Sequence, residues 1–482
     1  MTEEEFMKRF LEFEFQNKMF KVKINGVHIW HYIRYTVYYE LLGKYVYDKK
    51  YILPNSRGKK VQFETKWDKF WRENIKCSQF MARQRDVLII QHPRKYKDHG
   101  DYYKCIYTSL LDQYLTNSHY MLSGKSMENE YAKQDSKNVL YLNIDSFQKI
   151  KRIKYMEMQV SRTEVERLVI NPLEKFLNIK IDAKLKKKIA TLIINCLSGR
   201  QIWINYYNYM LQRIKPKIIL IVVAYSVDNM ILCEVAKKRK IPTVELQHGR
   251  IDNMHIAYNF YKKINLPGFP DYIFTFGQME KKSVRFPIDE ENIILVGYPE
   301  LEKNFNLYCK KNMEKEKKKK IILFISPGGD AVVAQYAYHI AQQLDENKYH
   351  IIFKLHPQEY YNWKLSMGVY LNHPNIEVVG DYEQTIYSFI SKADWIIGNF
   401  STALFEAQMF DAKMAIIKEG SYHVSKILYD NGCALLVDSP EKLAKEIEQD
   451  LFEPNKEINF FEKSSLEKMQ RNIDNIITKH DR

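Results

Sequence analysis

A histidine followed by a proline, His356 and Pro357, comes directly after the apolar stretch 349–355. A proline fixes its own φ angle and keeps the preceding residue out of helical angles, so His356 should be held in place at the end of a strand. Lys354 lies two residues earlier and should share a strand face with His356. An imidazole and an ammonium on one face suit an anionic group such as a phosphate. The alternative is a proline that only ends a strand beside an incidental histidine.

A second histidine, His248, follows another apolar stretch, within the sequence ELQHG. The glycine at position 249 lets the backbone turn sharply and approach a ligand. A histidine in this place can act as a base near neutral pH. Gln247 precedes it at the same strand end. The alternative is a loop histidine that bonds only to the backbone.

Two glycines, Gly328 and Gly329, lie between an apolar stretch and a helical pattern. Backbone amides in such a turn favour phosphate, although the pattern is neither GxGxxG nor a P-loop. The alternative is an ordinary tight turn.

A fourth strand end carries polar residues that begin a helical pattern. Asn and Ser are common helix N-caps, which is the simple interpretation. Hydroxyls and amides at a helix start can also bind phosphate, and a carboxylate one turn later could reach a ribose. The residues concerned are Asn399, Ser401, Thr402 and Glu406.

These residues all follow short apolar segments that alternate with helical patterns. Such alternation predicts α/β domains with parallel sheets, whose ligands lie beyond the carboxyl ends of the strands. We predict a helical, aromatic-rich N-terminal segment at 1–85 and a first Rossmann-like domain at 86–305. A linker at 306–320 leads to a second Rossmann-like domain at 321–460 and a C-terminal helix at 461–482.

Net charge, cysteine spacing and the length of apolar runs indicate the cell compartment and the class of partner. The net charge of +15 favours polyanions, membrane surfaces or phosphorylated substrates. The six cysteines form no CxxC pair, and no zinc spacing is present. The longest apolar run, Ile218–Tyr225, is far shorter than the roughly 20 residues of a membrane helix. We expect a cytoplasmic protein, without a signal peptide, that its charge could hold on the inner face of the membrane.

In this order, the motifs resemble those of GT-B glycosyltransferases of bacterial capsule and surface-polysaccharide assembly. The stretch FKLHP is followed 45 positions later (401 − 356) by STALFEA, similar to the donor-nucleotide motifs of bacterial sialyltransferases and Kdo transferases. CDP-glycerol glycerophosphotransferases have similar motifs, and ELQHG resembles their His-Gly motif. Histidine–proline pairs also occur at His92 and His373, but only His356 is followed by a Ser-Thr helix start and Glu406.

The resemblance implies roles for single residues in two Rossmann-like domains that face a cleft. His356 would contact the donor phosphate and help the nucleotide leave, with Pro357 fixing the ring. His248 would serve as acceptor base or phosphate contact. Asp98 and Asp101, on either side of Gly100, loosely match the sialyltransferase base motif. The other implied donor-site residues are Gly328, Gly329, Lys354, Asn399, Ser401, Thr402 and Glu406. The acceptor side would include Gln247, Gly249 and Asp98, and Asp101 would be a catalytic candidate.

We therefore expect a glycosyltransferase that moves a sugar from a CMP- or other nucleotide-activated donor to a surface polysaccharide, lipopolysaccharide or lipid-linked acceptor. The sequence has no Asp-x-Asp motif, so we expect neither a metal nor a cofactor. Alternatives are a CDP-polyol phosphotransferase, a UDP-sugar 2-epimerase, an inactive member of an assembly complex, and a basic nucleic-acid-binding protein. The last lacks RRM, KH or helix-turn-helix signatures, so no nucleic-acid partner is expected.

Overall fold

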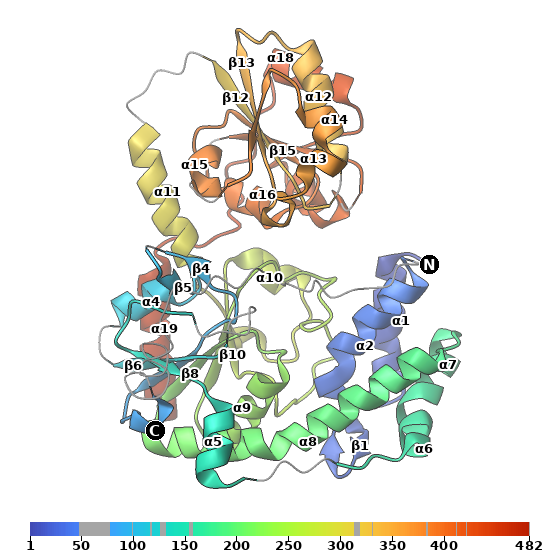
Figure 1. Ribbon diagram of the computed structural model, residues 1–482, viewed down its shortest axis with the longest axis vertical. Helices are drawn as coiled ribbons and strands as arrows, with labels where there is room; N and C mark the ends of the chain where they lie inside the picture. Colours follow the sequence, from blue (N-terminus) through green and yellow to red (C-terminus); the bar gives the residue numbers. More distant parts are fainter. Residues whose placement is uncertain are drawn as a thin grey trace. The chain divides into compact units, whose positions relative to one another are not determined.

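The computed structural model describes residues 1–47, 78–98, 100–115, 118–125, 132–153, 158–312, 319–329, 331–381, 384–410, 412–420 and 422–481. The chain divides into two compact units (Figure 1). Unit 1 contains residues 1–297 and 464–482, and unit 2 contains residues 298–463. Each unit is built on its own parallel sheet, which confirms the predicted α/β class with two Rossmann-like halves.

Within the described residues, the sheet of unit 1 has seven parallel strands in the order β11-β10-β9-β8-β3-β6-β7. The chain runs outward from β3 to β7 and then returns to the other side of β3 for β8. The ends of β3 and β8 therefore flank a topological switch point, where ligands of doubly wound sheets bind. The strands are β3 (Val87–Ile90), β6 (His119–Ser123), β7 (Val139–Tyr141), β8 (Ile218–Val222), β9 (Thr243–Leu246), β10 (Tyr272–Thr275) and β11 (Ile293–Leu295).

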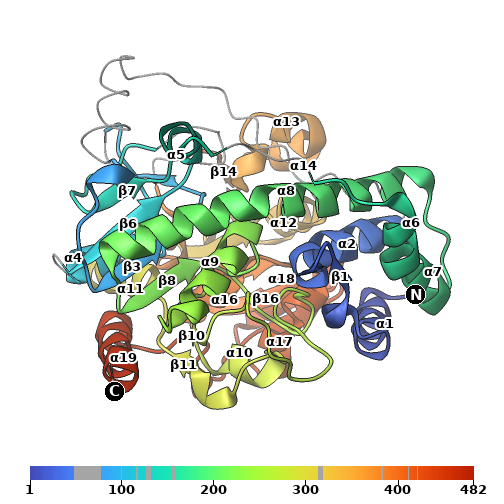
Figure 2. The ribbon, with the colours of Figure 1, turned by 90° about the horizontal axis from the view of Figure 1, so that it is seen from below.

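Helices cover both faces of this sheet (Figure 2). Successive side chains of β8 alternate between the faces. Leu220 belongs to the core that also contains residues of α19 (Ser465–His480), and Ile221 belongs to the core formed with α8 (Ala183–Ile214). Burial on both faces explains why residues 218–222 are apolar without interruption.

The N-terminal helices α1 (Glu3–Gln16) and α2 (Trp30–Tyr45) pack into the same core as α8. Their contact is aromatic, with the Phe10 and Trp30 rings stacked at 6.0 Å. A buried ion pair, Arg34 to Glu14 at 2.7 Å, ties the two helices together. The aromatic-rich helical start of the chain is thus confirmed over the residues described, while residues 48–77 lie outside them.

The remaining described α-helices of unit 1 have between four and twelve residues, and its hairpins have strands of two residues. They are β1 (Lys23–Ile24), β2 (Val27–His28), β4 (Tyr96–Lys97), β5 (Tyr103–Lys104), α4 (Ser109–Tyr114), α5 (Ile144–Lys151), α6 (Arg162–Val165), α7 (Asn171–Leu177), α9 (Val227–Lys238) and α10 (Gln278–Ser283).

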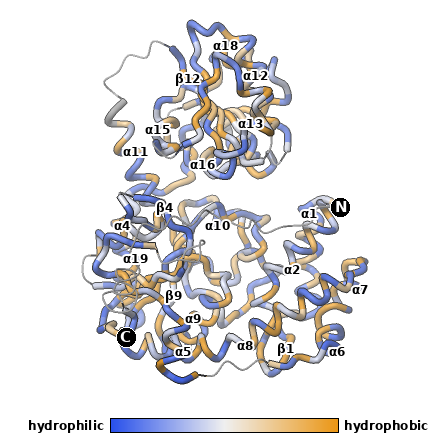
Figure 3. The backbone as a smooth tube through the Cα atoms, viewed as in Figure 1, coloured by the Kyte–Doolittle hydropathy of each residue, from blue (hydrophilic) through white to orange (hydrophobic). Residues whose placement is uncertain are grey.

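In the part of the chain that the structure describes, unit 2 has a sheet of six parallel strands in the order β14-β13-β12-β15-β16-β17. The switch point lies between β12 and β15. Figure 3 shows β12 as a hydrophobic segment inside this unit. The strands are β12 (Lys320–Ile325), β13 (Tyr349–Lys354), β14 (Ile376–Val379), β15 (Trp395–Gly398), β16 (Lys413–Ile417) and β17 (Leu435–Val437).

Unit 2 begins with a helix. Residues 306–312, which the sequence placed in a linker, belong to α11 (Pro299–Asn312), and residues 313–318 lie outside the described ranges. The other helices are α12 (Val332–Gln343), α13 (Trp363–Ser366), α14 (Gly368–Leu371), α15 (Ile386–Ile390), α16 (Thr402–Ala407), α17 (Lys426–Asp430) and α18 (Pro440–Gln449). Among the described residues, none of the helices of either unit has the length and hydropathy to span a bilayer.

Candidate functional site

The loop after β12 approaches the His356 ring closely. Gly328 and Gly329 have φ angles of +91° and +81°, which side chains rarely adopt. A Cβ atom at Gly328 would lie 3.1 Å from Nδ1 of His356. The amide of Gly329 donates to Glu359 at 2.8 Å, and that of Gly328 faces Ser326 Oγ at 3.4 Å. Both amides thus have acceptors inside the protein, and the glycine at position 328 allows the close approach of the loop to the imidazole.

The backbone and ring of His356 are fixed by local geometry. Its φ and ψ of −69° and 143° are extended, as expected for a residue before proline. Its Nδ1 accepts the amide N–H of Gln358 at 3.3 Å. Because Nδ1 is an acceptor, the proton of the neutral ring lies on Nε2, which makes that atom a donor.

Glu359 joins the loops that follow β12 and β13. Its buried carboxylate accepts the amide N–H groups of Gly329 at 2.8 Å and His356 at 2.9 Å. Sequence reasoning missed this residue. The signal was present, because the spacing HPQE is that of a capping box around the short 3₁₀ helix Pro357–Glu359.

Lys354 is buried and braces the neighbouring loops. Its ammonium donates to the Tyr360 hydroxyl at 2.8 Å and to the Asp381 carbonyl at 3.0 Å. Desolvation lowers the pKa of Lys354. Contact of Lys354 with a donor phosphate stays a prediction, because two of its three protons have acceptors inside unit 2.

The segment after β15 forms the start of α16. Ser401 caps this helix by accepting the Ala403 amide at 3.2 Å, as the simple interpretation expects. Its own hydroxyl proton can still be donated to a ligand oxygen. Asn399 is fully buried and accepts the next amide at 2.8 Å, whereas Thr402 is exposed.

Glu406 lies one turn into α16 and is protonated more readily than an ordinary glutamate. Burial raises its pKa to about 7, and a hydrogen bond with Tyr387 opposes part of that rise. Near neutral pH this side chain is a mixture of carboxylic acid and carboxylate, so it could donate to or accept from a ribose hydroxyl.

Three of the four predicted strand ends meet in unit 2. Strand β12 pairs with β13 on one side and with β15 on the other. Because the strands are parallel, the Gly328 loop, His356 and Ser401 follow their adjacent carboxyl ends. The three strand ends therefore lie around the switch point of unit 2.

The fourth strand end, in unit 1, contains a pair of histidines. His248 follows β9 and its ring stacks on that of His92, which follows β3, at 5.5 Å between centroids. The Tyr225 hydroxyl, after β8, lies 3.2 Å from Nε2 of His248. Burial is the main cause that lowers the pKa of both His92 and His248 to about 3, so both rings are neutral at pH 7.

A buried carboxyl lies behind His248. Oε1 of Glu245 is 4.0 Å from Nδ1 of His248 and accepts the amide of Ala224 at 3.0 Å and the hydroxyl of Tyr258. Burial raises the pKa of Glu245 to about 7. Sequence reasoning missed both Glu245 and His92. Glu245 lies within a buried strand, and the His92–Pro93 pair is not followed by a Ser-Thr helix start as His356 is.

Backbone strain marks the neighbouring end of β8. Val223, the residue after β8, has a φ of +72°, where a β-branched side chain is a conformational outlier. The turn brings the Ala224 amide to Glu245 and the Tyr225 hydroxyl to His248. Such strain persists only where surrounding contacts enforce it, and it is concentrated at functional sites.

Gln247 and Gly249 stabilise the turn itself. The Gln247 amide nitrogen donates to the Gly249 carbonyl and to Glu280, both at 2.8 Å, and its oxygen accepts the Phe276 amide at 2.6 Å. Gly249 has no left-handed φ, and a Cβ atom there would meet no atom within 4 Å. The sequence predicted a sharp turn that needs glycine at position 249, and that prediction is wrong, because this backbone conformation and the space around it admit a side chain.

The two predicted aspartates lie on the hairpin β4–β5. Asp98 is 3.5 Å from the Lys104 ammonium, and Asp101 is exposed in the turn beside Gly100, whose φ is +51°. Both carboxylates are exposed, whereas the rings of His92 and His248 are largely buried. The role of Asp101 as a base stays a prediction.

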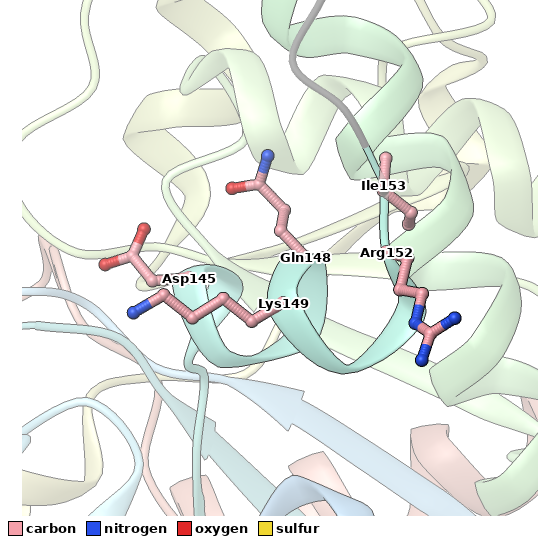
Figure 4. Close-up of a pocket in the computed structure, with 5 residues that line it drawn as sticks. All are labelled: Asp145, Gln148, Lys149, Arg152 and Ile153. Carbon is pink, nitrogen blue, oxygen red and sulfur yellow. The ribbon is translucent and has the colours of Figure 1, made fainter.

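An open surface pocket of about 550 Å³ lies along α5 (Figure 4). It is lined by Asp145, Gln148, Lys149, Arg152 and Ile153. None of these is a predicted site residue. In the described ranges, no group of three or more His, Cys, Asp or Glu side chains is arranged to hold a metal ion.

Comparisons with protein-family models and with curated proteins find no match. Similar solved structures include the UDP-GlcNAc 2-epimerase of Methanocaldococcus jannaschii, at 14% identity and TM-score 0.47, covering 81% of this chain and 99% of that one. The S. aureus MnaA–UDP structure is 13% identical at TM-score 0.46, covering 82% and 98%. The calicheamicin glycosyltransferase CalG4 is 11% identical at TM-score 0.43, covering 83% and 95%. With TM-scores below 0.5, these similarities assign neither activity nor substrate to this chain.

Proposed function

We propose that this protein is a metal-independent glycosyltransferase that uses a nucleotide-activated sugar, with its donor site in unit 2. The observation that carries the proposal is the contact between the Gly328 loop and the His356 ring at the switch point of the sheet. Its acceptor would be a surface polysaccharide or a lipid-linked glycan, extended in the cytoplasm or at the inner face of the membrane.

The donor site offers hydrogen-bond donors that suit a departing phosphate. Nε2 of His356 and the hydroxyls of Ser401 and Thr402 can donate to phosphate oxygens. Transfer forms a bond between the acceptor oxygen, which gives up its proton to a base, and the anomeric carbon of the sugar. The bond from that carbon to the phosphate oxygen breaks, and the nucleotide leaves with the electron pair. Preorganised donors stabilise that developing charge without a metal ion.

The base for the acceptor hydroxyl is proposed to come from unit 1. Burial lowers the pKa of His248 to about 3, so its ring is neutral at pH 7 but is a weaker base than an ordinary histidine. Tyr225 beside its Nε2 can pass a proton to or from the ring. Asp101 is the second candidate, on the resemblance to sialyltransferases alone.

The UDP-sugar 2-epimerase is a second candidate, favoured by the histidine pair in unit 1. Epimerisation requires removal and return of a proton at a sugar carbon, and the two imidazoles stacked at 5.5 Å are both neutral at pH 7. An epimerase makes its product without an acceptor, which separates it from a transferase. A CDP-polyol phosphotransferase would use the same donor groups but break a phosphorus–oxygen bond.

Nucleotide binding tests the donor site directly. The melting temperature of the protein should rise with at least one of CMP, CDP, UDP and GDP, because a ligand of the folded state stabilises it. His356→Asn should lose most of that rise. His373→Asn is the matched control, because His373 also precedes a proline and its Nδ1 also accepts an amide, at 3.2 Å. No response to any nucleotide, or equal responses of both variants, would contradict the proposal.

The products then distinguish the three reactions. The nucleotide sugar whose nucleotide binds should be consumed only when a glycan acceptor is added. Isomeric nucleotide sugar formed without acceptor would establish the epimerase instead. Release of CMP from CDP-glycerol would establish the polyol phosphotransferase.

A further inference from the structure

Three of the most exposed large apolar side chains of the described chain lie within nine residues of unit 2. Tyr361, Leu365 and Val369 are 94%, 93% and 77% exposed. They recur every four residues along a turn and the short helices α13 (Trp363–Ser366) and α14 (Gly368–Leu371), and all three side chains project into solvent. We call these three residues the outer stripe.

The opposite face of the same segment is already used by the core of unit 2. Met367 and Leu371 are 2% exposed and belong to that core, with Trp363 packed against it. The segment therefore has two apolar faces, of which one is buried. A helical segment that is apolar on both faces is normally covered on both, and scattered single apolar residues would not form such a row.

Charge and composition decide between possible partners. Lys364 is the only charged residue among 360–376, and the whole chain carries a net charge of +15. Two copies with that charge repel each other, whereas an anionic bilayer attracts both the chain and Lys364. Tyrosine and tryptophan beside leucine and lysine are typical of segments that lie in the membrane interface.

We propose that the outer stripe inserts into the surface of an anionic lipid bilayer and holds the protein there. The stripe begins five residues after His356, at Tyr361. Attachment through it would hold the candidate donor site at the membrane, where a lipid-linked acceptor is found. The binding itself does not depend on the proposed activity.

Sedimentation with vesicles tests this surface. The full-length protein should bind vesicles of equal parts phosphatidylglycerol and phosphatidylcholine, and bind vesicles of phosphatidylcholine alone much more weakly. Tyr361→Ser combined with Leu365→Ser should lower the partition coefficient by at least about tenfold, because two apolar side chains that would enter the bilayer are removed. Lys364→Glu should weaken binding to the anionic vesicles alone.

Leu451→Ser is the matched control, because Leu451 is also 77% exposed but lies on another segment. It should bind as the unchanged protein does. Equal binding by the double variant would overturn the proposal. A change from dimer to monomer in the double variant, measured by light scattering, would instead identify a second copy as the partner. A nucleotide response that persists in the double variant would separate this surface from the donor site.

Discussion

All three histidine–proline pairs of the described chain share one local geometry. In each, the histidine Nδ1 accepts the amide two residues later, at 2.9 Å for His92, 3.3 Å for His356 and 3.2 Å for His373. What differs is the neighbour in space. His356 meets Gly328, His92 stacks on His248, and His373 lies edge-on to Tyr338 at 5.7 Å. The dipeptide sets the orientation of a ring, and the fold decides what that ring contacts.

At this scale we predict that Gly328→Ala weakens nucleotide binding by at least about tenfold. The new Cβ atom would meet the His356 ring at 3.1 Å, and the φ of +91° would be strained. Binding is measured by calorimetry with the nucleotide that raises the melting temperature. Gly199→Ala in α8, where a Cβ atom meets nothing within 4 Å, should bind normally. Unchanged affinity in Gly328→Ala would show that the glycine contact is not part of the site.

At the scale of elements, α2 shows how packing controls protonation. His31 lies on α2 and is buried inside unit 1. Burial, followed by the charges of Arg34 and Lys237, lowers the pKa of His31 to about 3. The unfolded chain binds a proton at this histidine below about pH 6.5, whereas the folded chain does not.

Stability should therefore fall as the pH drops from 6.5 toward 3, by about 1.4 kcal/mol per pH unit for this one group. His31→Asn should remove about 2 kcal/mol of the loss between pH 6.5 and pH 5. Urea unfolding at pH 7 and pH 5 measures the difference. His28→Asn, in the exposed position of β2, is the control and should keep the slope of the unchanged protein. The same slope in His31→Asn would mean that His31 is protonated in the folded state.

At the scale of the whole molecule, the two units repeat one architectural plan. In each, the first strand lies centrally, later strands are added on one side and then on the other, and polar residues follow the strands at the switch point. The polar groups differ. Unit 2 presents a glycine loop, an imidazole and hydroxyls, whereas unit 1 presents two neutral imidazoles in front of a buried carboxyl.

We predict that a bound nucleotide acts on unit 2 alone. Hydrogen exchange with saturating CDP or UDP should slow at residues 326–329, 356–360 and 399–404. Exchange at residues 92–95 and 247–249 of unit 1 should not change. Slowed exchange confined to unit 1 would reverse the proposed assignment of donor and acceptor sites.

The sequence by itself determined the α/β class, because strands buried on both faces must be apolar without interruption, and residues 218–222 and 351–353 are. It also determined the local conformation of His356, because proline restricts the residue before it. The strand ends followed from the same pattern, so their polar residues could be chosen from the sequence.

Only the tertiary structure decided which of these residues meet. Glu359 reaches Gly329 across thirty positions of sequence, and His92 reaches His248 across more than one hundred and fifty. Strand order governs such contacts, and no local pattern encodes it. Burial likewise shifts the pKa of Glu245 and His248 in opposite directions, since desolvation disfavours whichever form is charged. That effect depends on what covers a side chain, which the sequence does not state.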